Sequence, residues 1–141
     1  MTQEGESAVS ECLSALARAE AVGLLSPVKG LWMAAWDHAT DQGATGGMGH
    51  TGSDGSTPEK RLMRHGTFSG ERCGYGENIT YGPDTGREIV CGLLIDDGVP
   101  DRGHRINTLQ KDFTQTAASC GPHPGFRVVC VITFAVGFRN N

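Results

Sequence analysis

The chain has 141 residues, a formal net charge of −4 and a pI of about 5.7, which suits one domain with one core. It has no cluster of Lys and Arg and no apolar run near the roughly 18 residues of a membrane span, so we expect neither nucleic-acid binding nor a transmembrane segment. The 21 glycines, about twice the usual share, favour a loop-rich domain over a helix bundle.

The first third of the chain predicts two helices. Residues 8–20 carry apolar side chains at helical spacing. A second helix is predicted over about 27–42, with Pro27 near its start. Its wide apolar stripe consists of Val28, Leu31, Trp32, Ala35, Trp36 and Ala39. We therefore expect both tryptophans in the core.

The middle of the chain predicts two shorter helices between glycine-rich loops. Thr57 precedes Pro58 and predicts a helix that starts there and ends near His65. Residues 67–76 read as a loop, and a short strand is expected around Ile79. A capping box, Thr85-Gly-Arg-Glu88, then predicts a helix over about 86–95.

The C-terminal third predicts two strands, over 113–120 and 126–134, joined by residues 121–125. In the second strand, alternate residues are expected to pack inward: Phe126, Val128, Cys130, Ile132 and Phe134. Because helices precede the strands and one helix intervenes, the order favours an α+β fold with an antiparallel sheet over an alternating βα array.

Five cysteines leave at least one without an intramolecular partner. No Cys-x-x-Cys pair is present, which argues against a structural zinc knot. Cys120 and Cys130 flank the connection between the two predicted strands and are the best candidates for a disulfide. Cys91 lies in an apolar helical run, so we expect it to be a buried thiol.

The chemically interesting residues are two histidines and three acids: His50, Glu77, Asp96, Asp97 and His104. Two neutral imidazoles can share an ion such as Zn²⁺ and leave positions open for water. A nearby carboxylate can orient an imidazole or act as a base. Spacing alone does not bring these groups together, and each also reads as an ordinary loop or turn residue.

Several motifs, in order along the chain, resemble those of the CAP superfamily, which comprises cysteine-rich secretory proteins, antigen 5 and pathogenesis-related 1 proteins. The likeness is greatest to the short microbial SCP-like members and spans about residues 8–136. The motifs are Asp37-His38, His50 to Pro58 followed by Arg61, Gly76-Glu77-Asn78-Ile79, Gly103-His104-Arg105-x-Asn107, and Cys130 to Phe134.

The resemblance implies an α-β-α sandwich with a central antiparallel sheet and an open cavity, formed by a domain over 8–136 with short tails at 1–7 and 137–141. The family's cavity tetrad of two histidines and two acids falls on His50, Glu77, Asp96 and His104. Asp97 is the alternative to Asp96, because longer members carry a glutamate there and a longer loop before the histidine.

The resemblance also implies a secreted protein, although the first residues have neither the basic nor the apolar region of a signal peptide. We expect a monomeric binding module rather than an enzyme, because no obvious nucleophile is present. Its cavity would hold a divalent ion such as Zn²⁺ through His50 and His104, with a lipid, sterol or protein ligand nearby. One alternative is a metal-dependent hydrolase with Glu77 as base; another is a defence or signalling protein that acts through surface loops.

Overall fold

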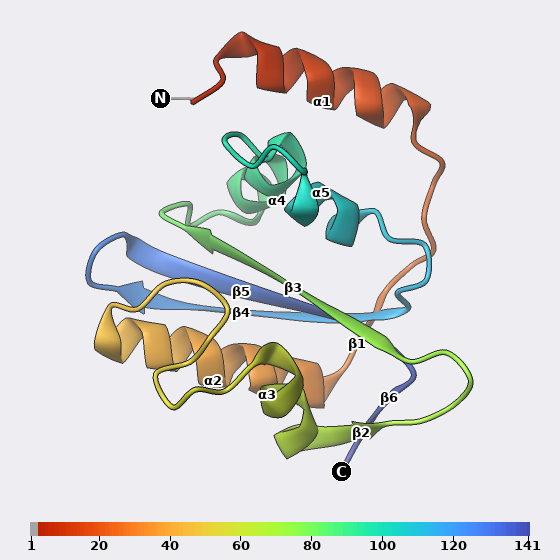
Figure 1. The fold of residues 1–141 in the computed structure, drawn as a ribbon, viewed down its shortest axis with the longest axis vertical. Coiled ribbons are helices and arrows are strands. Elements are labelled where there is room, and N and C mark those ends of the chain that lie inside the picture. The colour runs from red at the N-terminus through yellow and green to blue at the C-terminus, as the bar shows by residue number, and fades with distance from the viewer. Residues whose placement is uncertain (1–2) are drawn as a thin grey trace.

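The computed structural model describes residues 3–141 and has three layers, with helices on both faces of a central sheet (Figure 1). The helices, in chain order, are α1 (Glu6–Arg18), α2 (Lys29–Thr45), α3 (Pro58–His65), α4 (Gly86–Ile95) and α5 (Gly103–Thr108). Helices α2 and α3 cover one face, α4 and α5 cover the other, and α1 lies outside α4 (Figure 1). This arrangement confirms the predicted α-β-α sandwich.

The central sheet has the strand order β1-β4-β5-β3, and a separate small sheet pairs β2 with β6. The strands are β1 (Ser26–Pro27), β2 (Gly66–Phe68), β3 (Gly74–Tyr81), β4 (Gln115–His123), β5 (Arg127–Val136) and β6 (Phe138–Asn140). Strand β5 runs antiparallel to both neighbours, which confirms the predicted pairing of the last two long strands, while β1 runs parallel to β4.

Strand β5 is buried on both faces. Val129 and Val131 pack against Ala39 and its neighbours on α2, whereas Cys130 packs against Leu93 on α4. The predicted inward set is therefore one of two buried faces, because helices cover the sheet on both sides. The prediction is wrong for Phe126, since this residue lies before β5, in the turn from β4, and is 41% exposed.

The prediction that both tryptophans lie in the core is wrong. Trp32 is 45% and Trp36 50% exposed, and their rings stack on the outside of α2 with centroids 6.5 Å apart. The buried face of α2 instead presents small side chains, among them Ala35 and Ala39, which let the helix lie close to the sheet. The apolar stripe on α2 is thus wider than the face that the sheet covers.

Both predicted helix caps are confirmed. Thr57 Oγ1 accepts a hydrogen bond from the Lys60 backbone N–H at the start of α3. Thr85 Oγ1 accepts from the Glu88 N–H at the start of α4 and donates to the Glu88 carboxylate. Each cap joins residues only three positions apart, which is why the sequence pattern predicts where these two helices start.

Several segments differ from the prediction. Pro27 lies in β1 rather than α2, because the N–H groups on either side of it bond to carbonyls of the β4 segment and its missing N–H costs nothing there. The loop expected over 67–76 contains most of β2 and the start of β3 at Gly74. Helix α5 replaces an expected turn. Residues 138–140, expected in a tail, form β6 and bury Phe138.

The cysteines follow the prediction at one site and depart from it at another. Cys120 and Cys130 form a disulfide across β4 and β5, as expected from their positions in paired strands. Cys91 is exposed, so the expectation of a buried thiol is wrong. Helix α4 turns Ile89 and Leu93 toward the sheet, which places Cys91 on its outer face.

Candidate functional site

His50, Glu77 and His104 line one cavity of about 390 Å³. The loop after α2 contributes His50, strand β3 contributes Glu77, and helix α5 contributes His104. The complete lining is His50, Glu77, Val99, Asp101, Gly103, His104, Ile106 and Asn107. The fold thus brings together three residues that the sequence singles out, from three separate elements.

Glu77 lines this cavity and is buried, and both of its carboxylate oxygens have hydrogen-bond partners. Its Oε1 lies 2.9 Å from His50 Nδ1, and Arg61 donates to its two oxygens at 3.1 and 2.8 Å. Glu77 is 7% exposed and Arg61 1%, so the two charges are paired away from water. Arg61 therefore keeps Glu77 in place as an acceptor for the His50 ring.

Asp96 has the same relation to the second histidine. Its Oδ1 lies 2.6 Å from His104 Nδ1, and its Oδ2 accepts from the His104 backbone N–H at 2.9 Å. Asp96 is 3% exposed and ends α4 in the left-handed region at φ 55°. Asp97 points elsewhere and accepts from the N–H groups of Gln3 and Glu4. The acid that contacts His104 is therefore Asp96 and not Asp97.

These contacts fix the tautomer of both rings. An ionised carboxylate only accepts, so Nδ1 of His50 and of His104 must each donate a proton to its partner. In the neutral ring, Nε2 then carries the lone pair. Neither Nε2 makes a hydrogen bond to any of residues 3–141, and the side chains of His50 and His104 are 50% and 26% exposed. The cavity wall thus presents two free imidazole acceptors.

The backbone just before His50 is held by the partly buried Tyr81 on one side and by two buried polar residues on the other. Gly49 N–H donates to the Tyr81 hydroxyl at 2.9 Å, and its carbonyl accepts from His38 Nε2 at 2.8 Å and from Gln42 Nε2 at 2.6 Å. Burial lowers the pKa of His38, which keeps that ring neutral. Arg61 adds a bond to the His50 carbonyl at 3.0 Å.

Sequence reasoning did not assign His38, Gln42, Tyr81 or Arg61 to the site. The sequence favours a surface or packing role for His38, and the residue is fully buried. The available signal was weak: His38 and Gln42 are polar residues four positions apart on the helix face that also carries Leu31 and Ala35. Such a pair on a buried face needs partners, but the sequence does not show that the partners lie in the His50 loop and β3.

Helix α5 is fixed to β3 by side-chain amides. Asn78, which is fully buried, donates to the His104 carbonyl at 2.9 Å, and Asn107 donates to Asn78 Oδ1 at 2.9 Å. Neighbouring residues of β3 therefore serve both histidines, since Glu77 holds the His50 ring and Asn78 holds the His104 backbone.

Within residues 3–141, no three side chains of the His, Cys, Asp or Glu types are grouped so that together they could hold a metal ion. Over the same residues, no helix combines the length and apolar character needed to cross a bilayer.

The chain resembles known proteins in sequence pattern and in fold. The family model described as CAP, cysteine-rich secretory protein family, matches residues 9–134. No curated protein matches significantly. An outer surface protein from Borrelia burgdorferi has a similar structure, with a TM-score of 0.64, 17% identity, and coverage of 92% of this chain and 86% of that one. An extracellular protein containing an SCP domain from Bacillus anthracis str. Ames matches with a TM-score of 0.65 and 22% identity over 80% of this chain, and 34% of that longer chain is covered.

Proposed function

Because this chain belongs to the CAP family of cysteine-rich secretory proteins, we propose that it is an extracellular binding module whose cavity takes a divalent cation through His50 and His104. The observation that carries this proposal is the pair of free Nε2 acceptors on the wall of one cavity. A carboxylate bound to Nδ1 is the usual partner of a metal-ligating histidine, since it fixes the tautomer and makes Nε2 a better ligand.

The donor set fits an ion that is only partly coordinated by the protein. Two imidazoles suit Zn²⁺ or another borderline divalent ion, and a site with two protein ligands would leave positions for water or a ligand atom. A bound ion would supply a Lewis acid and positive charge to an oxygen donor of a partner molecule. Glu77 and Asp96 would keep the two rings oriented whether water or a ligand atom fills the open positions.

The extracellular location rests on three supports. The family is described as secretory, and the two similar structures are described as an outer surface protein and an extracellular protein. The disulfide between Cys120 and Cys130 is of a kind that persists in oxidising compartments.

The contacts of Glu77 argue against a hydrolase. A general base needs an oxygen that can reach a water or substrate proton. Both oxygens of Glu77 instead accept hydrogen bonds from Arg61, and one also contacts His50.

Titration calorimetry with Zn²⁺ at pH 7.5 tests the proposal. We expect saturable binding at one site that is lost in His50→Ala and in His104→Ala and retained in the control His65→Gln, whose side chain contacts Asp37 and does not line the cavity. Binding should weaken at lower pH, because protons compete for the same imidazole nitrogens. Equal affinity in the wild type and both alanine variants would place the ion elsewhere and refute the proposal.

A further inference from the structure

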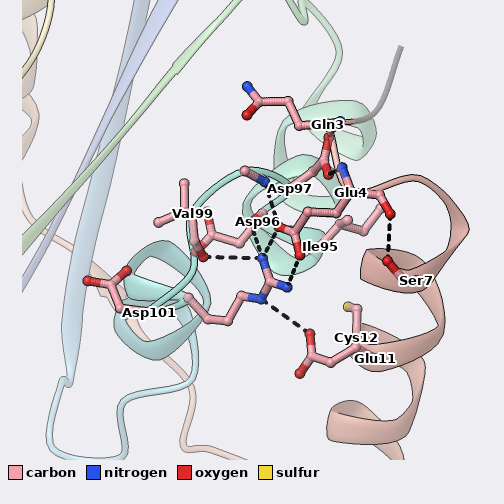
Figure 2. Close-up of polar contacts among 12 residues, drawn as sticks. Gln3, Glu4, Ser7, Glu11, Cys12, Ile95, Asp96, Asp97, Val99 and Asp101 are labelled. Atoms are coloured by element: carbon pink, nitrogen blue, oxygen red, sulfur yellow. Dashed lines mark hydrogen bonds and ion pairs between the residues drawn. The ribbon is translucent and has the colours of Figure 1, made fainter.

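The cavity wall that carries His104 is tied to the N-terminal segment. Figure 2 shows the N-terminal segment, with Gln3 and Glu4, beside the loop that carries Asp96 and Asp97. This loop supplies Val99 and Asp101 to the cavity lining. The two regions are 98 residues apart in sequence where Glu4 meets Arg102.

Glu4 is the centre of the contact. Its carboxylate accepts two parallel hydrogen bonds from Arg102, at 2.6 and 2.7 Å, and a third from the Gly98 backbone N–H at 2.8 Å. In return, Asp97 accepts from the Gln3 and Glu4 backbone N–H groups at 2.5 and 2.8 Å. A two-point arginine–carboxylate pair fixes direction as well as distance. The N-terminal segment and the loop therefore each donate hydrogen bonds to a carboxylate of the other.

The loop has a backbone shape that needs such support. Asp96 and Arg102, at its two ends, have φ values of 55° and 53°, and Gly98 has 79°. The left-handed region is disfavoured for residues that carry a Cβ atom. Arg102 also donates to the carbonyls of Asp96 and Val99, at 2.8 and 3.2 Å, so one guanidinium holds the loop and the N-terminal segment together.

We infer that Gln3 and Glu4 form a clasp that sets the position of the Asp96–Arg102 loop and, through Asp96, the orientation of His104. Arg102 and Glu4 are positioning residues, since neither lines the cavity. The inference rests on the proposed cation site for its functional consequence: a partner or protease that withdraws the N-terminal segment would loosen one wall of the cavity and weaken cation binding.

The chain offers a matched control. Glu20 and Lys111 also form an ion pair between the region following α1 and a distant segment, and neither residue lines the cavity. Glu20→Gln removes the same charge as Glu4→Gln and leaves the clasp intact. Any effect common to both variants is therefore a general charge effect.

Amide exchange measured by NMR separates the clasp from a purely local contact. The N–H groups of Val99, Arg102 and His104 bond within the loop and not to Glu4. In Glu4→Gln we expect these amides to exchange about tenfold faster or more, and in Glu20→Gln to stay within about twofold of wild type. Arg102→Lys should reproduce the loosening, because lysine cannot make the paired bonds. Equal exchange in Glu4→Gln and Glu20→Gln would refute the clasp.

Calorimetry with Zn²⁺ alone tests the consequence. We expect Kd to rise about threefold or more in Glu4→Gln and to stay unchanged in Glu20→Gln. Equal affinity in wild type and Glu4→Gln, alongside faster exchange, would overturn the link between clasp and cavity. A wild-type protein that binds no Zn²⁺ would refute the proposed function, and the exchange experiment would still decide whether the clasp exists.

Discussion

The two histidines of the cavity are held in different ways. On the His50 side the supporting residues are buried: His38 and Gln42 are at most 1% exposed, and so is Arg61, which bonds to both Glu77 and the His50 carbonyl. On the His104 side, Asp96 is buried but its loop is held from outside by the N-terminal segment through contacts that lie at the surface. We conclude that buried residues support the His50 side, whereas on the His104 side Asp96 and Asn78 are buried but the loop also depends on contacts that solvent and salt can reach.

Arg61→Ala should remove the buried support of the His50 side and cause the largest loss of stability among these variants. It leaves the Glu77 carboxylate buried without its charged partner and also removes the bond to the His50 carbonyl. Breaking a buried pair in this way costs about 3–5 kcal/mol, a large part of the stability of a small domain. Urea denaturation of wild type and variant measures the loss. Arg64→Ala is the control, because its partner Asp54 is half exposed and ion pairs at the surface contribute little to stability. Similar losses in the two variants would show that the buried pair of Arg61 and Glu77 contributes no more to stability than a surface ion pair.

Asp96→Asn should change the chemistry of His104 more than the stability of the fold. The amide oxygen can still accept from the backbone N–H groups of His104 and Arg105, while the amide N–H₂ then faces His104 Nδ1. That ring must become the acceptor at Nδ1 and carry its proton on Nε2. We expect a loss of about 1–2 kcal/mol, because charged hydrogen bonds become neutral ones.

The imidazole ¹⁵N shifts of His104 distinguish the two tautomers and provide the measurement. The control is Asp101→Asn, since Asp101 bonds only to the Gly103 N–H among the described residues and lies at the surface. An unchanged His104 tautomer in Asp96→Asn would contradict the assignment of Asp96 as its partner.

Features with local causes could be predicted from the sequence. The caps at Thr57 and Thr85 each depend on a residue three positions away, and the pairing of β4 with β5 depends on a short turn. The cavity residues His50, Glu77 and His104 are identified by their glycine-framed motifs and the family resemblance, and the structure places all three on one cavity. That these residues lie close together could be predicted only from the fold, because each comes from a different element.

Features with distant causes could not be predicted. Apolar periodicity cannot distinguish the covered face of α2 from the edge that leaves Trp32 and Trp36 exposed, since the sheet decides how much of the helix is buried. Helix α5 has only 6 residues, too few for a periodic signal. The contact of Glu4 with Arg102 has no local signature, because both residues are ordinary charged surface types.

Tyr81→Phe tests how much a single hydroxyl contributes to the support of the His50 side. The hydroxyl links the Gly49 N–H to the Gln42 side chain, but Gly49 lies at the surface and water can replace one of these bonds. We expect a loss of about 1 kcal/mol, the net value of an ordinary hydrogen bond. Thermal denaturation compared with Tyr75→Phe, at a tyrosine that is 41% exposed, measures it. A Tyr81→Phe loss as large as that of Arg61→Ala would mean that the hydroxyl, and not the buried ion pair, supports the loop.

The clasp should have the smallest effect on global stability and the clearest dependence on pH. The hydrogen bonds from Arg102, together with that from the Gly98 N–H, lower the pKa of Glu4 from 4.5 to about 2. Because the pKa is lower in the folded state, the carboxylate stabilises the fold fully above about pH 4.5, and this contribution is lost as the pH falls toward 2. The difference in Tm between wild type and Glu4→Gln should therefore be constant from pH 7 to about pH 5 and shrink toward zero near pH 2. High salt at pH 7 should also reduce it, because the pair lies at the surface. A difference that persists unchanged at pH 2 would show that Glu4 acts through packing and not through its charge, and would leave Arg102 with its bonds inside the loop and its contact with Glu11.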